Sequence, residues 1–264
     1  LLDIDSEIGL LKDLETKKSV FLIHKHKNPC GVAVRDNLLD AYLDALSCDN
    51  VSAFGGILTS NQAIDIKVAE EINKLFFEVL IAPNFSENAL DLLKSKKNRI
   101  IIKLKSYPIN KYQTRSCLNG ILEQDIDDKI EKFDDFKVVT KISPNSTKSD
   151  DLVLASIIVK HTKSNCIAIV KNKQLIGSGM GQVSRIDALN QAIEKSKKFG
   201  FDLNESCLAS DAFFPFSDCV EISHANNINS IVQPGGSIKD QDSIDFCNKN
   251  RMSMVFSGIR HFRH

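Results

Sequence analysis

Residues 20–31 read VFLIHKHKNPCG, in which an unbroken apolar run, 20–23, leads directly into a polar segment, Lys25–Gly31. An apolar run without alternation is typical of a strand that is covered on both faces. We therefore expect a strand followed by a loop here. Similar runs recur at 51–58 (interrupted by Gly55 and Gly56), 79–81, 100–102, 166–170, 206–209, 230–232 and 252–256.

Segments with helical spacing of apolar residues stand between these runs, for example at 1–14, 38–46, 86–96 and 186–198. Helices and buried strands in alternation predict an α/β fold with three α/β/α layers and a mainly parallel central sheet. The periodicity weakens over 105–134, and the SPNSTKS segment is the best linker candidate. We expect a first subdomain at 1–142, a linker at 143–150 and a second subdomain at 151–264.

The composition limits the possible classes of protein. The chain has 264 residues, 34 Lys plus Arg against 34 Asp plus Glu, and 42% hydrophobic residues. A net charge of zero does not supply the cationic field of a general nucleic-acid binder. No apolar run approaches the roughly 20 residues of a membrane helix. We expect a folded globular protein that binds neither nucleic acid nor membrane.

The seven cysteines are scattered and never spaced CxxC. This pattern disfavours a disulfide framework and a four-thiolate zinc site, and it favours reduced thiols in the cytoplasm. The chain starts with LLDID, without an initiator Met. We therefore expect it to be a piece of a longer protein.

The Lys25–His26 pair places a cation beside a group that takes up a proton near neutral pH. An amine that attacks a carbonyl needs both, a base for its proton and a cation for the developing oxyanion. Asn28 and Pro29 favour a shaped loop. A solvated basic loop is the alternative.

Three further segments carry candidate binding residues. GSGMGQVSR at 177–185 lacks the spacing of a dinucleotide fingerprint, yet its glycines before a helix can present N–H groups to an anion. FFPF at 213–216 offers aromatic faces to a flat heterocycle. Arg260 and Arg263 can fork onto a phosphate. The alternatives are a tight turn, core phenylalanines and a basic tail.

A zinc deaminase site is rejected. It requires H-x-E or C-x-E followed by P-C-x-x-C. Pro29 and Cys30 are present, but Ala33 occupies the position of the second thiolate. His24 and His26 are two residues apart, which suits ligation of one metal poorly.

Taken together, these segments resemble the transformylase domain of the AICAR formyltransferase/IMP cyclohydrolase family, over essentially the whole chain. The segments that carry the resemblance are KHKNPCG, VSAFGG, FFEVLIAP, VKHTKSN, GSGMGQVSR, ASDAFFPFSD, QPGGSIKD and the terminal RHFRH. The resemblance implies two tandem cytidine-deaminase-like subdomains without catalytic zinc. It also implies a homodimer with active sites at the subunit interface.

The implied reaction is transfer of the formyl group of 10-formyltetrahydrofolate, the cosubstrate, to the 5-amino group of AICAR in inosinate biosynthesis. By resemblance, His26 accepts the proton, Lys25 stabilises the transition state and Asn165 orients the reacting groups. The matching AICAR positions are Gly55, Glu78, Asn165, Arg185, Phe213 and Arg260. The matching folate positions are Ile186, Asp218, Ser237 and Ile238. Thr162, Ser164 and Asp211 match positions that surround a potassium ion in some relatives.

Two departures from the family pattern matter. Position 78 is Glu where some relatives carry Asp. The chain also lacks the cyclohydrolase domain and the R-Y-G-x-N-P-H-Q segment that helps relatives hold AICAR. A non-catalytic nucleotide-binding or dimerisation fragment is therefore the alternative function.

Overall fold

The computed structural model describes residues 1–14 and 16–264. Its helices are α1 (Leu2–Asp13), α2 (Leu38–Cys48), α3 (Ile66–Ile72), α4 (Glu87–Lys94), α5 (Ser146–Lys160), α6 (Arg185–Lys198), α7 (Asp218–Ala225), α8 (Asp240–Lys249) and the 3-10 turn η1 (Phe133–Asp135). None of these described helices is both long and apolar enough to cross a membrane.

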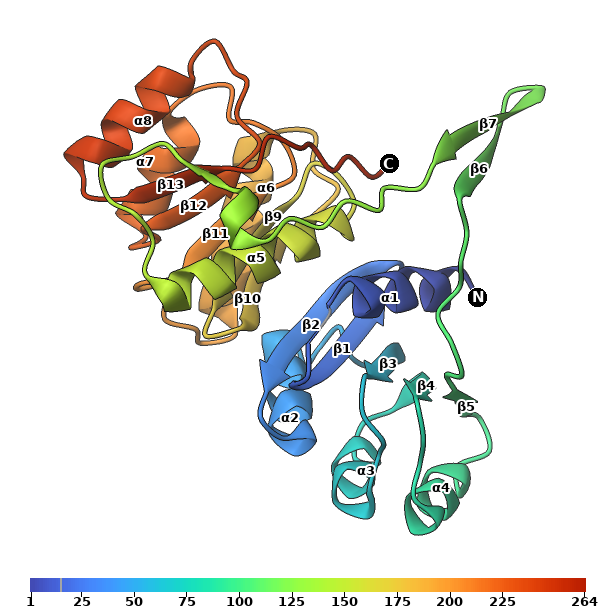
Figure 1. The fold of residues 1–264 in the computed structure, drawn as a ribbon. Helices are drawn as coiled ribbons and strands as arrows, with labels where there is room; N and C mark the ends of the chain where they lie inside the picture. Colours follow the sequence, from blue (N-terminus) through green and yellow to red (C-terminus); the bar gives the residue numbers. More distant parts are fainter. Residues whose placement is uncertain (15) are drawn as a thin grey trace.

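The strands are named in Figure 1. They are β1 (Ser19–Lys25), β2 (Asn28–Arg35), β3 (Gly56–Ser60), β4 (Phe77–Ala82), β5 (Ile100–Lys103), β6 (Tyr112–Cys117), β7 (Gly120–Asp125), β8 (Lys137–Val138), β9 (Ile167–Lys171), β10 (Gln174–Gly179), β11 (Cys207–Ser210), β12 (Ser230–Gln233) and β13 (Ser253–Phe256). Within the described residues, eleven of them form one sheet in the order β5-β4-β3-β1-β2-β10-β9-β11-β12-β13-β8. The α/β class is confirmed.

The sheet is mixed rather than mainly parallel. The pairs β3–β4, β4–β5, β11–β12 and β12–β13 are parallel. The central pairs from β3 across to β11 are antiparallel. The edge pair β13–β8 is antiparallel as well. The expectation of a mainly parallel sheet therefore holds only for β3–β5 and β11–β13, because burial on both faces does not fix strand direction.

Two tight hairpins account for the antiparallel centre. His26 and Lys27 join β1 to β2, and Asn172 and Lys173 join β9 to β10, all four with φ between +51° and +65°. Two-residue turns with positive φ match the twist of paired strands. The expected loop at 25–31 is therefore wrong, because all but its two turn residues belong to strands. In the 51–58 run, only the part from Gly56 onward is strand.

The two halves share one order of elements. The first runs β2-β1-β3-β4-β5 across the sheet and the second runs β10-β9-β11-β12-β13. In each half, a helix precedes the hairpin and three more helices alternate with the later strands. This correspondence supports the expectation of two related subdomains. Their exact limits stay a prediction.

The helices cover both faces of the sheet (Figure 1). On one face, α1 and α5 pack over both halves and share a core that includes Leu11, Leu22, Leu152 and Val170. On the other face, each half has a separate core, under α2–α4 in the first and under α6–α8 in the second. These are the three expected layers, and they explain why β1 is apolar on both sides.

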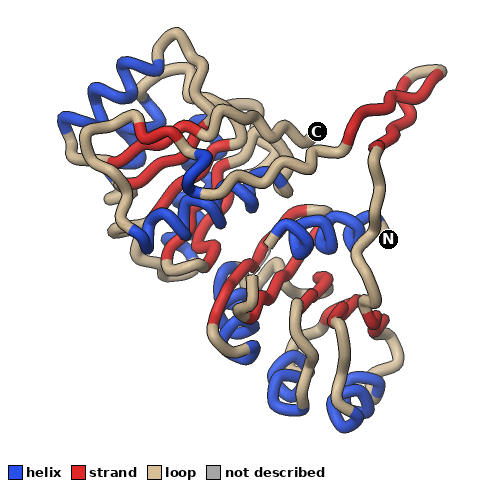
Figure 2. The backbone as a smooth tube through the Cα atoms, in the orientation of Figure 1, coloured by secondary structure: helices blue, strands red, loops and turns tan. Residues whose placement is uncertain are grey.

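The connection between the halves is longer than expected. After β5 the chain leaves the body, forms the exposed β6–β7 hairpin and returns to β8, as Figure 2 shows. The expected linker at 143–150 is partly helical, because α5 begins at Ser146. Its N-cap, Asn145, accepts a hydrogen bond from the Lys148 N–H at 2.9 Å. Asn is a strong helix N-cap, which explains the early start.

Two glycines of β10 allow α6 to lie close to the sheet. A Cβ atom on Gly179 would stand 1.8 Å from the Ala188 carbonyl oxygen, and one on Gly177 would stand 2.4 Å from the Ala192 carbonyl oxygen. Both contacts are with the backbone of α6, which cannot rotate away.

We predict that Gly179→Ala lowers the free energy of unfolding by about 1–3 kcal/mol, because overpacking forces α6 off the sheet. Urea denaturation measures the change. Gly120→Ala is the matched control, because the nearest atom to its Cβ, the Cys117 carbonyl oxygen, is 3.9 Å away. Equal stability of the two variants would contradict this account of the packing.

Candidate active site

One edge of the sheet collects the segments that the sequence singles out. In the first half, β1 ends at Lys25, where β3 begins at Gly56 and β4 at Phe77. In the second half, β9 begins at Ile167, where β11 ends at Ser210. These ends meet at one edge because β2 is antiparallel to both β1 and β10.

The turn between β1 and β2 presents the predicted proton acceptor. His26 is exposed at its tip, and the Asn28 side-chain amide donates to the His26 carbonyl oxygen at 2.9 Å. Lys25 is half-buried, and its Nζ donates to the Phe54 carbonyl oxygen. The ammonium is thereby held next to the segment that leads into β3.

Gly55 lies beside this ammonium, just before β3, and Glu78 is near the start of the neighbouring strand β4. Gly55 has φ +68°, and a Cβ atom there would be 3.4 Å from the Lys25 Nζ. Its N–H donates to the Phe76 carbonyl oxygen at 2.8 Å. Glu78 is the exposed residue of β4, at an irregularity in the β3–β4 register. Such a bulge redirects a side chain, here out of the core.

A buried group in the second half joins Asn165 to Arg185. The Arg185 Nη2 donates to the Asn165 Oδ1 at 3.0 Å, and Nη1 donates to the Cys166 carbonyl oxygen at 3.2 Å. Arg185 also forms an ion pair with Asp211, whose side chain is fully buried. The structure thus brings together two predicted AICAR residues and one predicted potassium residue.

The other two potassium candidates, Thr162 and Ser164, shortly precede Asn165 in the chain. The Thr162 hydroxyl donates to the Ile158 carbonyl oxygen at 2.7 Å, and the Ser164 hydroxyl accepts from the Arg263 N–H at 3.0 Å. The second carboxylate oxygen of Asp211 is buried and has no partner among the described residues.

Phe213 and Arg260 are also brought together. The Arg260 guanidinium carbon lies 6.0 Å from the centre of the half-buried Phe213 ring and 5.4 Å from that of Phe262. A guanidinium over a ring face is held by the ring quadrupole and keeps its donors free. The pair can therefore hold a planar ring and an anionic group.

The predicted folate residues lie at the N-terminal ends of three neighbouring helices. Ile186 is in the first turn of α6, Asp218 begins α7, and Ser237 and Ile238 precede α8. Ile238 is 99% exposed. The described structure has no hydrogen bond among the four, so it places them on one rim without joining them.

Contacts across the two halves hold the His26 turn in place. The Lys163 N–H donates to the Asn28 Oδ1 at 2.9 Å. The Ser6 hydroxyl donates to the Lys27 carbonyl oxygen at 3.0 Å and accepts from the Arg263 Nη2 at 2.9 Å. The turn is therefore fastened both to the loop before Asn165 and to the C-terminal segment.

The sequence analysis missed two ionic groups beside this edge. His261 lies between Asp127 and Glu131. Burial alone lowers the pKa of the His261 imidazole, but the two carboxylates outweigh it and raise the pKa to about 9. The RHFRH segment drew attention to position 261, but nothing in the aperiodic stretch around 127 indicated its partners.

The second missed group is Asp13 with Lys160 and His161, at 2.8 and 2.7 Å. Burial alone raises the pKa of the Asp13 carboxyl, but the hydrogen bond from His161 and the charge of Lys160 lower it overall. The carboxylate therefore stays ionised and joins α1 to the end of α5.

A third polar cluster joins helix α1 to strand β1. Its strand residue is His24, which directly precedes Lys25. Glu7 and His24 are fully buried, with 3.5 Å between the His24 Nδ1 and the Glu7 Oε1. Burial raises the pKa of Glu7 well above its usual value and lowers the pKa of His24 well below its own. Burial therefore favours the neutral form of both side chains.

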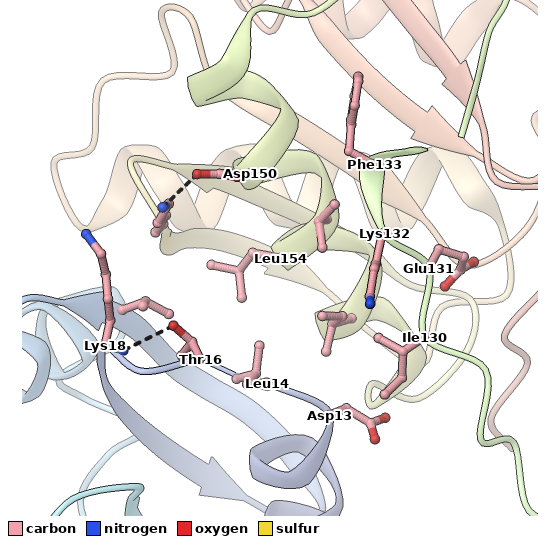
Figure 3. Close-up of a pocket in the computed structure, with 14 residues that line it drawn as sticks. Asp13, Leu14, Thr16, Lys18, Ile130, Glu131, Lys132, Phe133, Asp150 and Leu154 are labelled. Atoms are coloured by element: carbon pink, nitrogen blue, oxygen red, sulfur yellow. Dashed lines mark hydrogen bonds and ion pairs between the residues drawn. The ribbon is translucent and has the colours of Figure 1, made fainter. Parts of the chain in front are cut away.

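A cavity of about 570 Å³ is lined in part by Asp13 and Glu131 of the two ionic groups described above. Figure 3 shows it between the segment after α1 and helix α5. Val34, which lines it, pairs with Val20 at the end of the β1–β2 hairpin opposite His26. None of the residues that line the cavity is a predicted site residue, so we locate the candidate site by its polar groups instead.

The fold is an α/β sheet with polar and cationic side chains gathered at one edge, and comparison with known proteins identifies the family. The family model described as AICARFT/IMPCHase bienzyme matches residues 1–195, more than half of the chain. The chain belongs to this family.

Curated relatives agree over the whole chain. Bifunctional purine biosynthesis protein PurH of Bacteroides thetaiotaomicron is 52% identical over 264 residues, which cover 100% of this chain and 52% of the relative. The proteins of the same name from Acetivibrio thermocellus and Aquifex aeolicus are 47% and 43% identical, over 99% and 100% of this chain and 51% of each relative. The chain thus spans about half the length of these relatives.

We predict that Asp211→Ala lowers the free energy of unfolding by about 3–5 kcal/mol, because it leaves the buried Arg185 guanidinium without its carboxylate. Urea denaturation measures the loss. Asp242→Ala is the control, since its ion pair with Lys239 is more than half exposed on both sides and should hardly affect stability. Similar losses in both variants would contradict the buried pairing.

Proposed function

We propose that this chain transfers the formyl group of 10-formyltetrahydrofolate to the 5-amino group of AICAR, in purine biosynthesis. The observation that carries the proposal is that Lys25, His26, Asn165, Arg185 and Arg260 lie at one sheet edge in a member of this family. No residue of this chain is assigned to IMP cyclohydrolase, the second activity in the family description.

The proposed chemistry follows from the residue types. The amine nitrogen of AICAR attacks the formyl carbon, and its proton passes to the His26 imidazole. The Lys25 ammonium stabilises the negative charge that develops on the formyl oxygen. The bond between the formyl carbon and N10 of the folate then breaks, and N10 takes up a proton.

The neighbouring residues hold the two substrates. Because the Asn165 Oδ1 is occupied by Arg185, its amide nitrogen is left to donate to the carboxamide of AICAR. Phe213 and Arg260 take the ring and the phosphate, with Gly55 and Glu78 on the opposite side. Ile186, Asp218, Ser237 and Ile238 are proposed to contact the folate. Proximity of the two substrates supplies much of the rate.

Potassium belongs to the proposal as a structural ion. The buried, unpartnered carboxylate oxygen of Asp211 and the hydroxyls of Thr162 and Ser164 are hard oxygen ligands that suit such a cation. When bound, the ion would fix the loop before Asn165. No chemical step requires it, and the absence of a catalytic zinc remains a prediction.

A cytoplasmic location is also proposed. The cysteines are free thiols, and all except Cys117 are buried. Burial raises the pKa of Cys30, Cys48, Cys219 and Cys247 to about 12, so these thiols are unreactive core residues. Unpaired thiols of this kind favour a reducing compartment.

We predict that His26→Ala in the full-length protein lowers kcat for formyl transfer by about 10²–10⁴-fold, because the amine loses its general base. AICAR binding should stay within a few-fold, as calorimetry would show. Lys27→Ala is the matched control in the same turn and should retain activity. Unchanged turnover in His26→Ala would contradict the role of His26 as the general base. Wild-type protein that binds AICAR but yields no formylated product would favour the non-catalytic alternative.

We also propose a homodimer, supported by the β6–β7 hairpin. Every residue of both strands is exposed, and Leu118, Ile121 and Leu122 are 100%, 73% and 60% exposed. An isolated two-stranded hairpin is only marginally stable in water. Apolar side chains on a projecting arm therefore favour contact with a second copy of the chain.

We predict that Ile121→Asp/Leu122→Asp shifts the protein from dimer to monomer at micromolar concentration, because a charged arm no longer packs against the partner. Sedimentation velocity measures the shift. Gln124→Asp adds charge at a polar position of the same strand and should remain dimeric. A wild-type protein that is monomeric at high concentration would refute the dimer.

A further inference from the structure

Both nitrogens of the His261 ring contact carboxylates, and both carboxylates come from one short segment. Its Nδ1 lies 2.6 Å from the Asp127 Oδ2, and its Nε2 lies 3.0 and 3.1 Å from the two oxygens of Glu131. The His261 and Glu131 side chains are 3% and 4% exposed. A neutral imidazole has only one N–H donor, so two carboxylate contacts require the doubly protonated ring. The contacts are therefore charge-assisted on both sides.

These contacts between His261 and the two carboxylates join two segments that are far apart in sequence. Asp127 and Glu131 follow the β6–β7 hairpin, whereas His261 lies in the C-terminal segment, 257–264. Figure 1 shows the chain that returns from β7 passing beside the C-terminus. Lys160 completes the group, since its Nζ lies 4.0 Å from the Asp127 Oδ1 and donates to the Lys129 carbonyl oxygen at 2.8 Å.

The C-terminal segment is also held by main-chain hydrogen bonds on both sides of Arg260. Before it, the Ser257 and Gly258 N–H groups donate to the Gln233 and Pro234 carbonyl oxygens at 3.0 and 3.1 Å. The His261 N–H donates to the Asp211 carbonyl oxygen at 3.2 Å, and Arg263 binds Ser164 through its main chain. In the described part of the chain, the Arg260 side chain has only ring contacts and no hydrogen bond or ion pair. The side chain next to it, that of His261, is held by two carboxylates and is the ionic anchor nearest to Arg260 along the chain.

We infer that His261 is a positioning residue that fastens the C-terminal segment to residues 127–131 and thereby fixes Arg260 for the anionic group of the substrate. The part concerning substrate rests on the proposed function. The part concerning the fastening rests on the contacts alone. His261 itself does not touch the reacting atoms in this scheme.

The experiment compares His261→Gln, Asp127→Asn and the double variant in the full-length protein. We expect each single variant to raise the KM for AICAR about tenfold with kcat within about threefold, because Arg260 acts in binding rather than in the chemical step. The double variant should be no worse than either single variant, since the two side chains form one contact. A merely structural role would instead lower the active fraction and leave KM unchanged.

His224→Gln is the matched control, because this exposed histidine of α7 lies beside Phe246 and has no carboxylate pair in the described structure. It should leave KM unchanged. If His261→Gln does not fold, Asp127→Asn and Glu131→Gln carry the same test. Additive effects in the double variant, or an unchanged KM in every variant, would overturn the inference.

Amide hydrogen exchange separates this inference from the proposed function. The variants should speed exchange over 257–264 while leaving the core strands β1 and β9 protected. Unchanged exchange over 257–264 would overturn the inference whatever the activity. Failure of the wild-type protein to form formylated product would overturn the proposed function, and the exchange result would still decide whether His261 fastens the segment.

Discussion

The pairing of β2 with β10 joins the two halves into one sheet, and the site depends on it. At one end of this seam, the Val34 N–H donates to the Lys173 carbonyl oxygen at 3.0 Å, and Arg35 donates to the Asn172 carbonyl oxygen at 2.7 Å. At the other end, Asn28 accepts from the Lys163 N–H. Because β2 is antiparallel to both neighbours, the end of β1 and the end of β10 face the same way. Residues from both halves therefore meet at one edge, although each half alone would present only part of the set.

The sequence predicted which segments are strands better than it predicted how they pair. The apolar run at 79–81 became β4, because burial on both faces demands apolar residues. The run at 100–102 became β5, the edge strand, whose residues are exposed or half-buried. The same runs contain no information on direction. The hairpins were missed because their turns use His26, Lys27, Asn172 and Lys173, none of which is the glycine that usually marks a positive φ. The start of α5 was also missed, although a local signal was present. Asn145 is a good N-cap residue, but it lies in a Ser- and Lys-rich segment that was interpreted as a linker.

In the candidate site, too, some residues could be predicted from the sequence and others could not. Lys25, His26 and Asn165 could be singled out because each lies in a polar segment next to an apolar run, a pattern that sequence displays directly. The partnership of Arg185 with Asp211 could not, because the two are 26 positions apart and meet only through the β9–β11 pairing. The same holds for His261, whose two carboxylates lie 130 or more positions earlier in a stretch without periodicity. Such contacts depend on the path of a long connection, which propensity and spacing do not specify.

The distribution of charge gives an independent reason for an anionic substrate at this edge. The chain has no net charge, and lysines elsewhere, such as Lys148, Lys171 and Lys195, are paired with carboxylates. At the candidate site Arg185 is paired with Asp211, but three other cations have different partners. Lys25 binds a carbonyl oxygen, Arg260 lies against two rings, and Arg263 binds a carbonyl and a hydroxyl. In the described residues, none of these three has a carboxylate within ion-pair distance. A local positive excess in an otherwise balanced protein raises the concentration of anions where it lies. The proposed substrate, which bears a phosphate, and the proposed cosubstrate, which bears carboxylates, would both supply the negative charge that this edge lacks.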